Sequence, residues 1–238
     1  MQARDAGPAL VDWGRALWRR VAGVLDRTAP ESLAIVPAGA DAACAAGPVV
    51  MIPGVLEPWQ FLLPLARSLH AAGHPVYVLP ALGWNLRPLE PSVRAVADVL
   101  VAHDLQNVTL VGHSKGGLIA RAALLDPTLA SRLAGAITTC TPWHGTTLVP
   151  SWAVRTPLGM FRPQMSPEGT DRIVSLSPRY DQVVTEGSHL EGATNIQLGV
   201  GGHFGPTMSP GVHRLVHRWV HRLGADGDLT LIPGFGAI

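Results

Sequence analysis

Short apolar runs alternate along the chain with segments in which apolar residues recur every three or four positions. Apolar runs of this length, bounded by glycine, proline or polar residues, predict buried strands. We predict six strands, at residues 48–52, 76–79, 108–111, 135–140, 172–176 and 195–200. Helical spacing predicts the intervening helices at residues 58–72, 91–103, 115–125 and 209–223. Strands that alternate with helices predict an α/β fold, with a mostly parallel central sheet and helices on both faces.

The last predicted helix has clear signals at both ends. Ser209 and Pro210 precede its first turn, where a capping side chain and a proline are both favoured. Gly224 follows Leu223, and glycine is typical of the position after a helix, so we expect the helix to end there.

Residues 10–25 form a separate amphipathic pattern before the first strand. Five apolar residues stand three or four positions apart, namely Leu10, Trp13, Leu17, Val21 and Val24, with Arg15, Arg19 and Arg20 on the polar side. We interpret this segment as a helix packed on the edge of the domain, with binding to a membrane surface as the alternative. The organisation expected is a helix and arm at residues 1–30, then one domain at 31–238.

A long proline-containing segment at residues 145–170 interrupts the alternation after the fourth strand. Long loops without regular structure are uncommon in compact domains and often cover a ligand site. An insertion here would lie above the carboxyl ends of the strands, where open α/β sheets bind ligands. We therefore predict an apolar lid, with an irregular edge segment as the alternative. The substrate contacts expected in and beside it are Trp143, Trp152, Leu158 and Phe161.

The strongest chemical signal is the run Gly112-His113-Ser114-Lys115-Gly116-Gly117, which lies directly between a predicted strand and a predicted helix. This is the G-x-S-x-G pattern of a nucleophile elbow in the context that it requires. A sharp turn there holds the serine hydroxyl above the sheet, and glycines two residues away leave room for neighbouring backbone. The pattern predicts that Ser114 is a nucleophile, since an incidental serine in a glycine-rich turn does not need these flanking elements.

A serine nucleophile needs a base and a carboxylate that orients the base. His203 follows the last predicted strand, and Asp181 follows the strand before it, so both are expected at the carboxyl edge of the sheet. The chain order Ser114, Asp181, His203 is the order found in hydrolases of this type. Glu186 is the reserve for the acid, and His113 is the weaker candidate for the base.

Two backbone N–H groups are expected to stabilise the oxyanion of a tetrahedral intermediate. One is the N–H of Lys115, the residue after the nucleophile, and the other is the N–H of Val55, after Pro53-Gly54. The chemistry needs only the backbone of Lys115, so no role is predicted for its ammonium group.

Three histidines recur every four residues on the last predicted helix, at His213, His217 and His221. This spacing could place metal ligands on one helix face. Arginines flank all three, so we interpret the histidines as a solvated basic face rather than a ligand set. No metal site and no cofactor are predicted.

The composition narrows the remaining function classes. The 238 residues carry 18 Lys and Arg against 17 Asp and Glu, and this net charge of +1 argues against a nucleic-acid partner. Cys44 and Cys140 form no disulfide framework and are interpreted as thiols, although a bridge between them stays open. With no secretory signal pattern and no long apolar run, a cytoplasmic or peripheral membrane protein is expected. The oligomeric state is not predicted.

The chain resembles the bacterial lipases and esterases of the α/β-hydrolase family over about residues 48–222. Four stretches carry the resemblance: Ile52-Pro53-Gly54-Val55, the run around Ser114, Thr141-Pro142-Trp143-His144-Gly145-Thr146, and Asp181 with Gly201-Gly202-His203. The resemblance implies an α/β-hydrolase fold, with Ser114 as nucleophile, His203 as base, Asp181 as its orienting acid, and Val55 and Lys115 as oxyanion donors.

The function expected is hydrolysis of a carboxylic ester, of the lipase or esterase type, on an apolar or lipid-like substrate. An acyltransferase or a thioesterase could use the same three residues. From a different class, a non-catalytic binding protein could retain the fold, because a fold alone does not establish an activity. A plausible residue stands at each triad position, which favours the enzyme.

Overall fold

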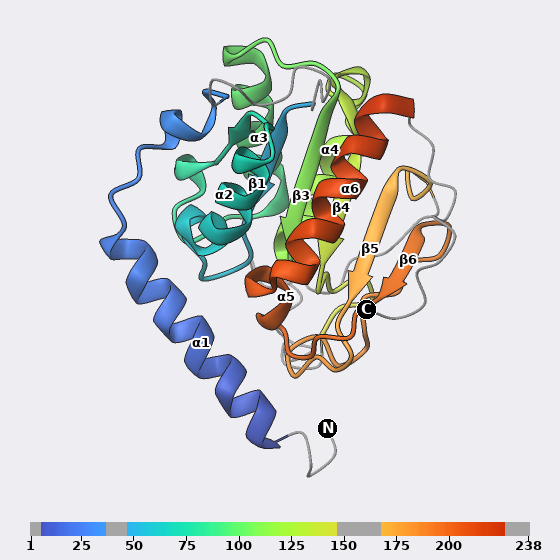
Figure 1. The fold of residues 1–238 in the computed structure, drawn as a ribbon. Helices are drawn as coiled ribbons and strands as arrows, with labels where there is room; N and C mark the ends of the chain where they lie inside the picture. Colours follow the sequence, from blue (N-terminus) through green and yellow to red (C-terminus); the bar gives the residue numbers. More distant parts are fainter. Residues whose placement is uncertain (1–5, 37–46, 147–167, 227–238) are drawn as a thin grey trace.

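A computed structural model of the chain describes residues 6–36, 47–146 and 168–226. Six strands form one parallel sheet in the order β2-β1-β3-β4-β5-β6 (Figure 1). Their bounds are β1 Val49–Ile52, β2 Val76–Tyr77, β3 Val108–His113, β4 Leu133–Thr139, β5 Ile173–Ser177 and β6 Thr194–Gln197. The longer helices are α1 Ala6–Leu25, α2 Leu63–Ala71, α3 Leu89–Ala102, α4 Lys115–Leu125 and α6 Pro210–Asp226. Shorter ones are α5 Gly205–Met208 and the 3-10 turns η2 Pro30–Leu33, η3 Trp59–Leu62, η4 Pro80–Leu82 and η5 Ala130–Arg132.

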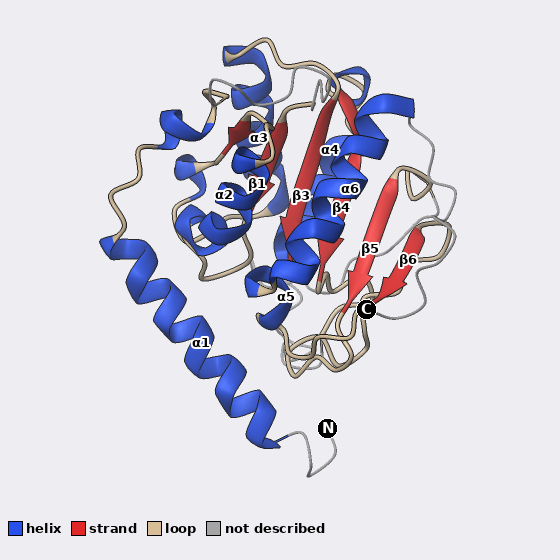
Figure 2. Cartoon of the chain, in the orientation of Figure 1, coloured by secondary structure: helices blue, strands red, loops and turns tan. Residues whose placement is uncertain are grey.

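The sheet is buried on both faces, so its central strands have nearly continuous apolar sequences. In β1, Val49 and Met51 point into a core that contains the inner residues of α2 and α6. Val50 and Ile52 point into the opposite core, which contains those of α3 and α4. Figure 2 shows α6 crossing one face of the sheet. The predicted α/β fold with helices on both faces is therefore confirmed.

The predicted elements match the observed ones, with differences at the ends. The second and sixth strands stop two and three residues earlier than expected, at Tyr77 and Gln197. The last helix continues through Gly224 to Asp226, so the expected stop at Gly224 was wrong. Gly224 is held inside the helix, where its carbonyl oxygen accepts a hydrogen bond from the side-chain amide of Asn107 at 2.7 Å.

The helix α1 packs on the domain by the side that the sequence pattern marked as polar. Asp12 and Ala16 are buried, and Arg19 donates to the carbonyl of Gln60 at 3.0 Å. The apolar residues of the pattern are exposed instead: Leu10, Trp13, Leu17, Val21 and Val24. The helix does lie on the domain edge, but the expected choice of face was wrong. Small residues, specific polar contacts and a ring contact between Trp13 and Phe204 hold the helix in place.

The first residues of α1 lie at the end of the molecule toward which the strand arrowheads point, and the helix runs from there along the side of the domain (Figure 1). The carboxyl ends of the strands carry the candidate chemistry, so α1 adjoins that edge. In the part of the chain that the structure describes, no helix combines the length and apolar character needed to cross a bilayer.

Candidate functional site

Ser114 lies in a sharp turn between β3 and α4, and its backbone has the unusual angles φ 53° and ψ −120°. A positive φ is strained for any residue with a side chain and is typical of functional positions. The N–H of Ser114 donates to the carbonyl of Thr139 at 2.8 Å, so the turn is fixed against the end of β4. The structure therefore has the strand–turn–helix arrangement that the sequence pattern predicted.

Two glycines make this turn possible. A Cβ atom at Gly112 would lie 2.6 Å from backbone atoms of Gly116 and Gly117. A Cβ atom at Gly116 would collide with the carbonyl oxygen of Ile52, at the end of β1. The glycines on both sides of Ser114 are therefore required because backbone segments approach each other closely.

Asp181 and His203 meet at the carboxyl edge, as the sequence predicted. The Nδ1 atom of His203 lies 2.9 Å from Oδ2 and 3.1 Å from Oδ1 of Asp181, and both side chains are 4% exposed. The acid loop, residues 178–184, follows β5, and the base loop, residues 201–204, follows β6. The loops pair through the N–H of Gly202, which donates to the carbonyl of Tyr180 at 2.8 Å.

The surroundings of Asp181 favour its charged form. Burial by itself would raise the pKa of this carboxyl, but the charge and hydrogen bond of His203 and two backbone N–H donors lower it below its ordinary value. The donors are the N–H groups of Val183 and Val184, at 2.8 and 2.7 Å from Oδ1. A carboxylate held in this way keeps Nδ1 of His203 protonated and leaves Nε2 able to accept a proton.

A turn at residues 53–56, here called the oxyanion turn after the predicted role of Val55, lies against Ser114. A Cβ atom at Gly54 would be 3.1 Å from Cβ of Ser114. The N–H of Lys115 belongs to the first turn of α4, where backbone donors have no partner within the helix. The structure thus brings the segments of both predicted oxyanion donors, Val55 and Lys115, to Ser114.

The oxyanion turn is held by a buried charge pair that the sequence analysis missed. Oε2 of Glu57 accepts the N–H of Gly54 at 2.7 Å and lies 2.9 Å from Nδ1 of His113, and both side chains are 1% exposed. Nε2 of His113 donates to the carbonyl of His203 at 3.0 Å. Since both ring nitrogens of His113 face acceptors, we assign the ring as an imidazolium. The pair therefore connects the oxyanion turn to the base loop.

The pKa of His113 supports this assignment. Burial alone would lower the pKa, but the charge and hydrogen bond of Glu57, the carbonyl of His203 and the charge of Asp181 raise it above its ordinary value. His113 is thus occupied in a structural pair, which leaves His203 as the base candidate.

The ammonium group of Lys115 also has a role that the sequence analysis did not predict. The side chain is fully buried, and Nζ donates to the carbonyl oxygens of Asn85, at 2.8 Å, and Arg87. Asn85 in turn donates from its side chain to the carbonyl of Pro53 at 2.7 Å. Lys115 therefore holds the segment that supports the oxyanion turn, and desolvation lowers its pKa to about 8.

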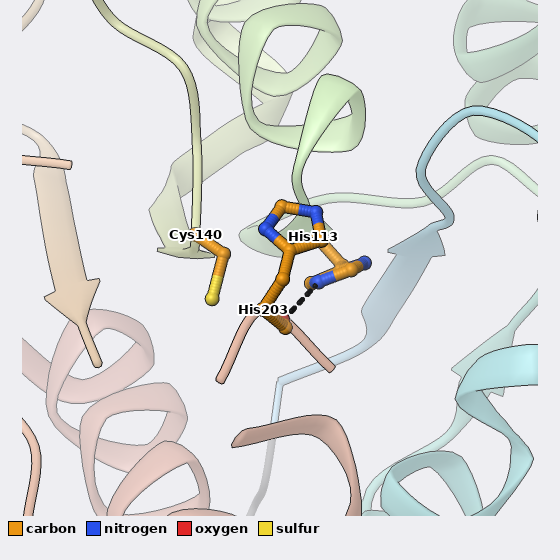
Figure 3. Close-up of side chains that lie close together, drawn as sticks. All are labelled: His113, Cys140 and His203. Carbon is orange, nitrogen blue, oxygen red and sulfur yellow. Dashed lines mark hydrogen bonds between the residues drawn. The ribbon is translucent and has the colours of Figure 1, made fainter. Parts of the chain in front are cut away.

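Figure 3 shows three side chains that converge beside the elbow, namely His113, Cys140 and His203. Their potential ligand atoms lie within 4.8 Å of one another, which raises the question of a metal ion. His113 uses both ring nitrogens in hydrogen bonds, and Nδ1 of His203 faces Asp181. Burial raises the pKa of the free thiol of Cys140 well above its ordinary value, and a protonated thiol is a poor ligand. The group fits a hydrogen-bonded site better than a metal centre.

Other predicted residues are held by different contacts or lie outside the described residues. Trp143 is buried in the core and donates to Oγ of Ser175 at 2.9 Å, so its position indicates packing and its substrate contact stays a prediction. Glu186 is exposed and accepts from its neighbour Thr185 at 3.0 Å. The positions outside the described residues are Cys44, Trp152, Leu158, Phe161 and residues 147–167 of the predicted lid.

The three histidines of α6 do not form the uniform solvated face that was expected. His213 is buried, and its Nε2 atom lies 2.9 Å from the carbonyl of Thr207, whereas His221 is exposed. His217 is half-buried, and its ring lies 5.1 Å from that of His74. The expectation was wrong for His213, because α5 places a backbone carbonyl against it.

Comparisons with known proteins agree with this fold. The family model for the alpha/beta hydrolase fold matches residues 47–183. Comparison with curated proteins gives no match. The mature lipase BlEst2 of Bacillus licheniformis is similar with a TM-score of 0.61 at 16% identity, over 79% of this chain and 96% of that one.

Two further solved structures are similar at low identity. Lipase B of Aspergillus fumigatus has a TM-score of 0.58 at 19% identity, over 80% of this chain and 57% of that one. The naproxen esterase of Bacillus subtilis has a TM-score of 0.53 at 13% identity, over 77% of this chain and 85% of that one. Likeness at these identities shows the fold alone, and together with the family match it supports a hydrolase. Because the family model covers more than half of its residues, the chain belongs to the α/β-hydrolase fold family.

Proposed function

We propose that the protein hydrolyses carboxylic esters through an acyl-enzyme on Ser114. The observation that carries the proposal is the buried pair of Asp181 and His203, at 2.9 Å, at the same sheet edge as the strained turn of Ser114. A carboxylate, an oriented imidazole and a serine in an elbow are the parts that acyl transfer requires.

In the proposed reaction, Oγ of Ser114 attacks the ester carbonyl while Nε2 of His203 accepts its proton. The N–H groups of Val55 and Lys115 stabilise the oxyanion of the tetrahedral intermediate. When the intermediate collapses, the alcohol leaves with the proton from His203, and the acyl group stays on Ser114. Water, deprotonated by His203, then releases the carboxylic acid and restores the hydroxyl of Ser114.

An apolar ester is the substrate class that we propose. The net charge of +1 provides no strong field for an ionic substrate. Near the nucleophile, Leu56 and Trp84 are exposed apolar residues, and they are joined by a backbone hydrogen bond of 2.9 Å. Hydrolysis of a thioester, or transfer of the acyl group to another alcohol, would use the same residues. The test therefore compares esters with thioesters.

A fluorophosphonate probe tests the nucleophile directly. We expect the probe to label the wild-type protein once, with the adduct on the peptide that contains Ser114, and His203→Ala to react far more slowly. Hydrolysis should be measured on a series of nitrophenyl esters of rising acyl length, beside the corresponding thioesters. Labelling of Ser114→Ala at the wild-type rate, or hydrolysis of none of these substrates, would contradict the proposed function.

We also propose that α1 contacts a lipid surface through its exposed side. That side carries large apolar residues and no charge, with Trp18 at 68% exposure; its members are Leu10, Val11, Trp13, Leu17, Trp18, Val21, Val24 and Leu25. Arg15 is exposed beside it, whereas Asp12, the single acidic residue of α1, is buried. A helix that exposes tryptophan, leucine and cationic residues is suited to an anionic lipid surface.

Vesicle binding tests this contact. The wild-type protein should sediment with vesicles of phosphatidylcholine and phosphatidylglycerol, and Leu17→Glu with Trp18→Glu should abolish sedimentation. Val101→Glu, at an equally exposed apolar site on α3, is the matched control and should bind like the wild type. A wild-type protein that stays in the supernatant, or forms a dimer that the double variant disrupts, would show that lipid does not cover this side.

A further inference from the structure

The helix α1 inserts one carboxylate among the loops of the candidate site. Asp12 is 1% exposed, although it belongs to a helix whose outer side faces solvent. Its Oδ1 atom is buried and has no hydrogen-bond partner within the described part of the chain. A buried carboxylate with one unpaired oxygen costs stability, so its presence calls for an explanation beyond helix packing.

The other oxygen, Oδ2, connects both loops of the acid–base pair. It accepts the backbone N–H of Phe204 at 2.9 Å and the side-chain amide of Gln182 at 2.7 Å. Gln182 uses its own oxygen to accept the backbone N–H of His203 at 3.0 Å. Asp12 therefore fixes the backbone on the C-terminal side of His203 directly, and the backbone N–H of His203 itself through Gln182.

The base loop has a backbone that fits this carboxylate closely. Gly202 has a φ of 91°, and a Cβ atom there would lie 2.5 to 2.7 Å from the carboxyl atoms of Asp12. Only glycine therefore allows the helix to approach the residue before His203. The ring of Trp13 adds an edge-to-face contact with Phe204, at 5.2 Å between ring centres. Two consecutive residues of α1 thus contact the base loop.

We propose that Asp12 is a positioning residue, which holds the imidazole of His203 in line between Asp181 and Ser114. The proposal rests on the proposed function, because it assigns His203 as the base. Asp12 acts through the backbone and does not contact the reacting groups. Loss of its oxygen would leave the N–H of Phe204 without its acceptor and release Gln182, so the base loop could shift while the rest of the sheet edge stayed in place.

Substitution of Asp12 tests the proposal. Both bonds end on one oxygen, so Asp12→Asn can present its amide oxygen to both donors and should keep nearly the wild-type kcat. Asp12→Ala should lower kcat for nitrophenyl esters by about 10²-fold with little change in KM, because a small displacement of a catalytic group has an effect of this size. Asp26→Ala is the control: Asp26 follows the far end of α1 and pairs with Arg67 at 3.2 Å. It should leave kcat unchanged.

A second readout does not depend on activity. The Nδ1 proton of His203, bonded to Asp181, should give a downfield proton NMR signal that persists in Asp12→Asn and broadens or disappears in Asp12→Ala. If the wild type hydrolyses no ester, the proposed function fails, and this signal still decides the positioning role. A folded Asp12→Ala with an unchanged signal and kcat would overturn the proposal, as would equal impairment of the Asn and Ala variants.

Discussion

Ser114→Ala should lower kcat for nitrophenyl esters by about 10⁶-fold. The members of a triad act as a unit, so removal of the nucleophile alone costs about as much rate as removal of the whole triad. The backbone of the turn should survive the change, because alanine adds no atom near Gly54 or Thr139. Steady-state kinetics should show the loss in kcat, and calorimetry should show an unfolding temperature close to that of the wild type.

A buried serine elsewhere provides the matched control for this variant. Ser92 lies in α3 and donates to the carbonyl of Pro88 at 2.8 Å, so Ser92→Ala removes a buried hydroxyl without altering the site. It should retain the wild-type kcat. If Ser114→Ala keeps activity within about tenfold of the wild type, well short of the loss expected for a nucleophile, the role of Ser114 is wrong.

Asp181→Asn should lower kcat by about 10⁴-fold through the tautomer of His203. The oxygen of asparagine can still accept the N–H groups of Val183 and Val184, which bond to a single oxygen of Asp181. Its NH₂ group would then face Nδ1 of His203 and favour the tautomer with the proton on Nε2. A protonated Nε2 cannot accept the proton of Ser114, so kcat/KM should fall together with kcat.

The same variant should change the dependence of stability on pH. Because the pKa of Asp181 is lower in the folded chain than its ordinary value of 3.8, its stabilising contribution is present above that pH and is lost as the pH falls below it. Asp181→Asn should lack this part of the acid dependence in unfolding experiments. Glu186→Gln is the control at an exposed carboxylate, and a loss of kcat there would transfer the role of the acid to Glu186.

The sheet, the turn at Ser114 and the contact between Asp181 and His203 could be predicted because each depends on local signals. The glycines around Ser114 follow from steric contacts within one turn, and strand order limits which later loops reach the same edge. Asp181 and His203 could therefore be chosen as candidates because each follows a predicted strand.

The supporting residues could not be predicted, because their partners lie far away in the sequence. Glu57 meets His113 across 56 positions, and Asp12 meets Phe204 across 192. No motif marks either acid. The apolar periodicity located α1 correctly, but the expectation that its apolar side packs inward was wrong. The only sequence feature that distinguishes Asp12 is that it is the single acidic residue of α1.

The buried position of Lys115 makes it a natural reporter of unfolding. It is the one lysine of the 238 residues, and in the folded protein its side chain has no exposed surface. An acylating reagent can reach this amine only when the start of α4 separates from the segment around Asn85. The rate at which mass spectrometry detects a modified Lys115 therefore measures how often this edge of the sheet opens, without any engineered label.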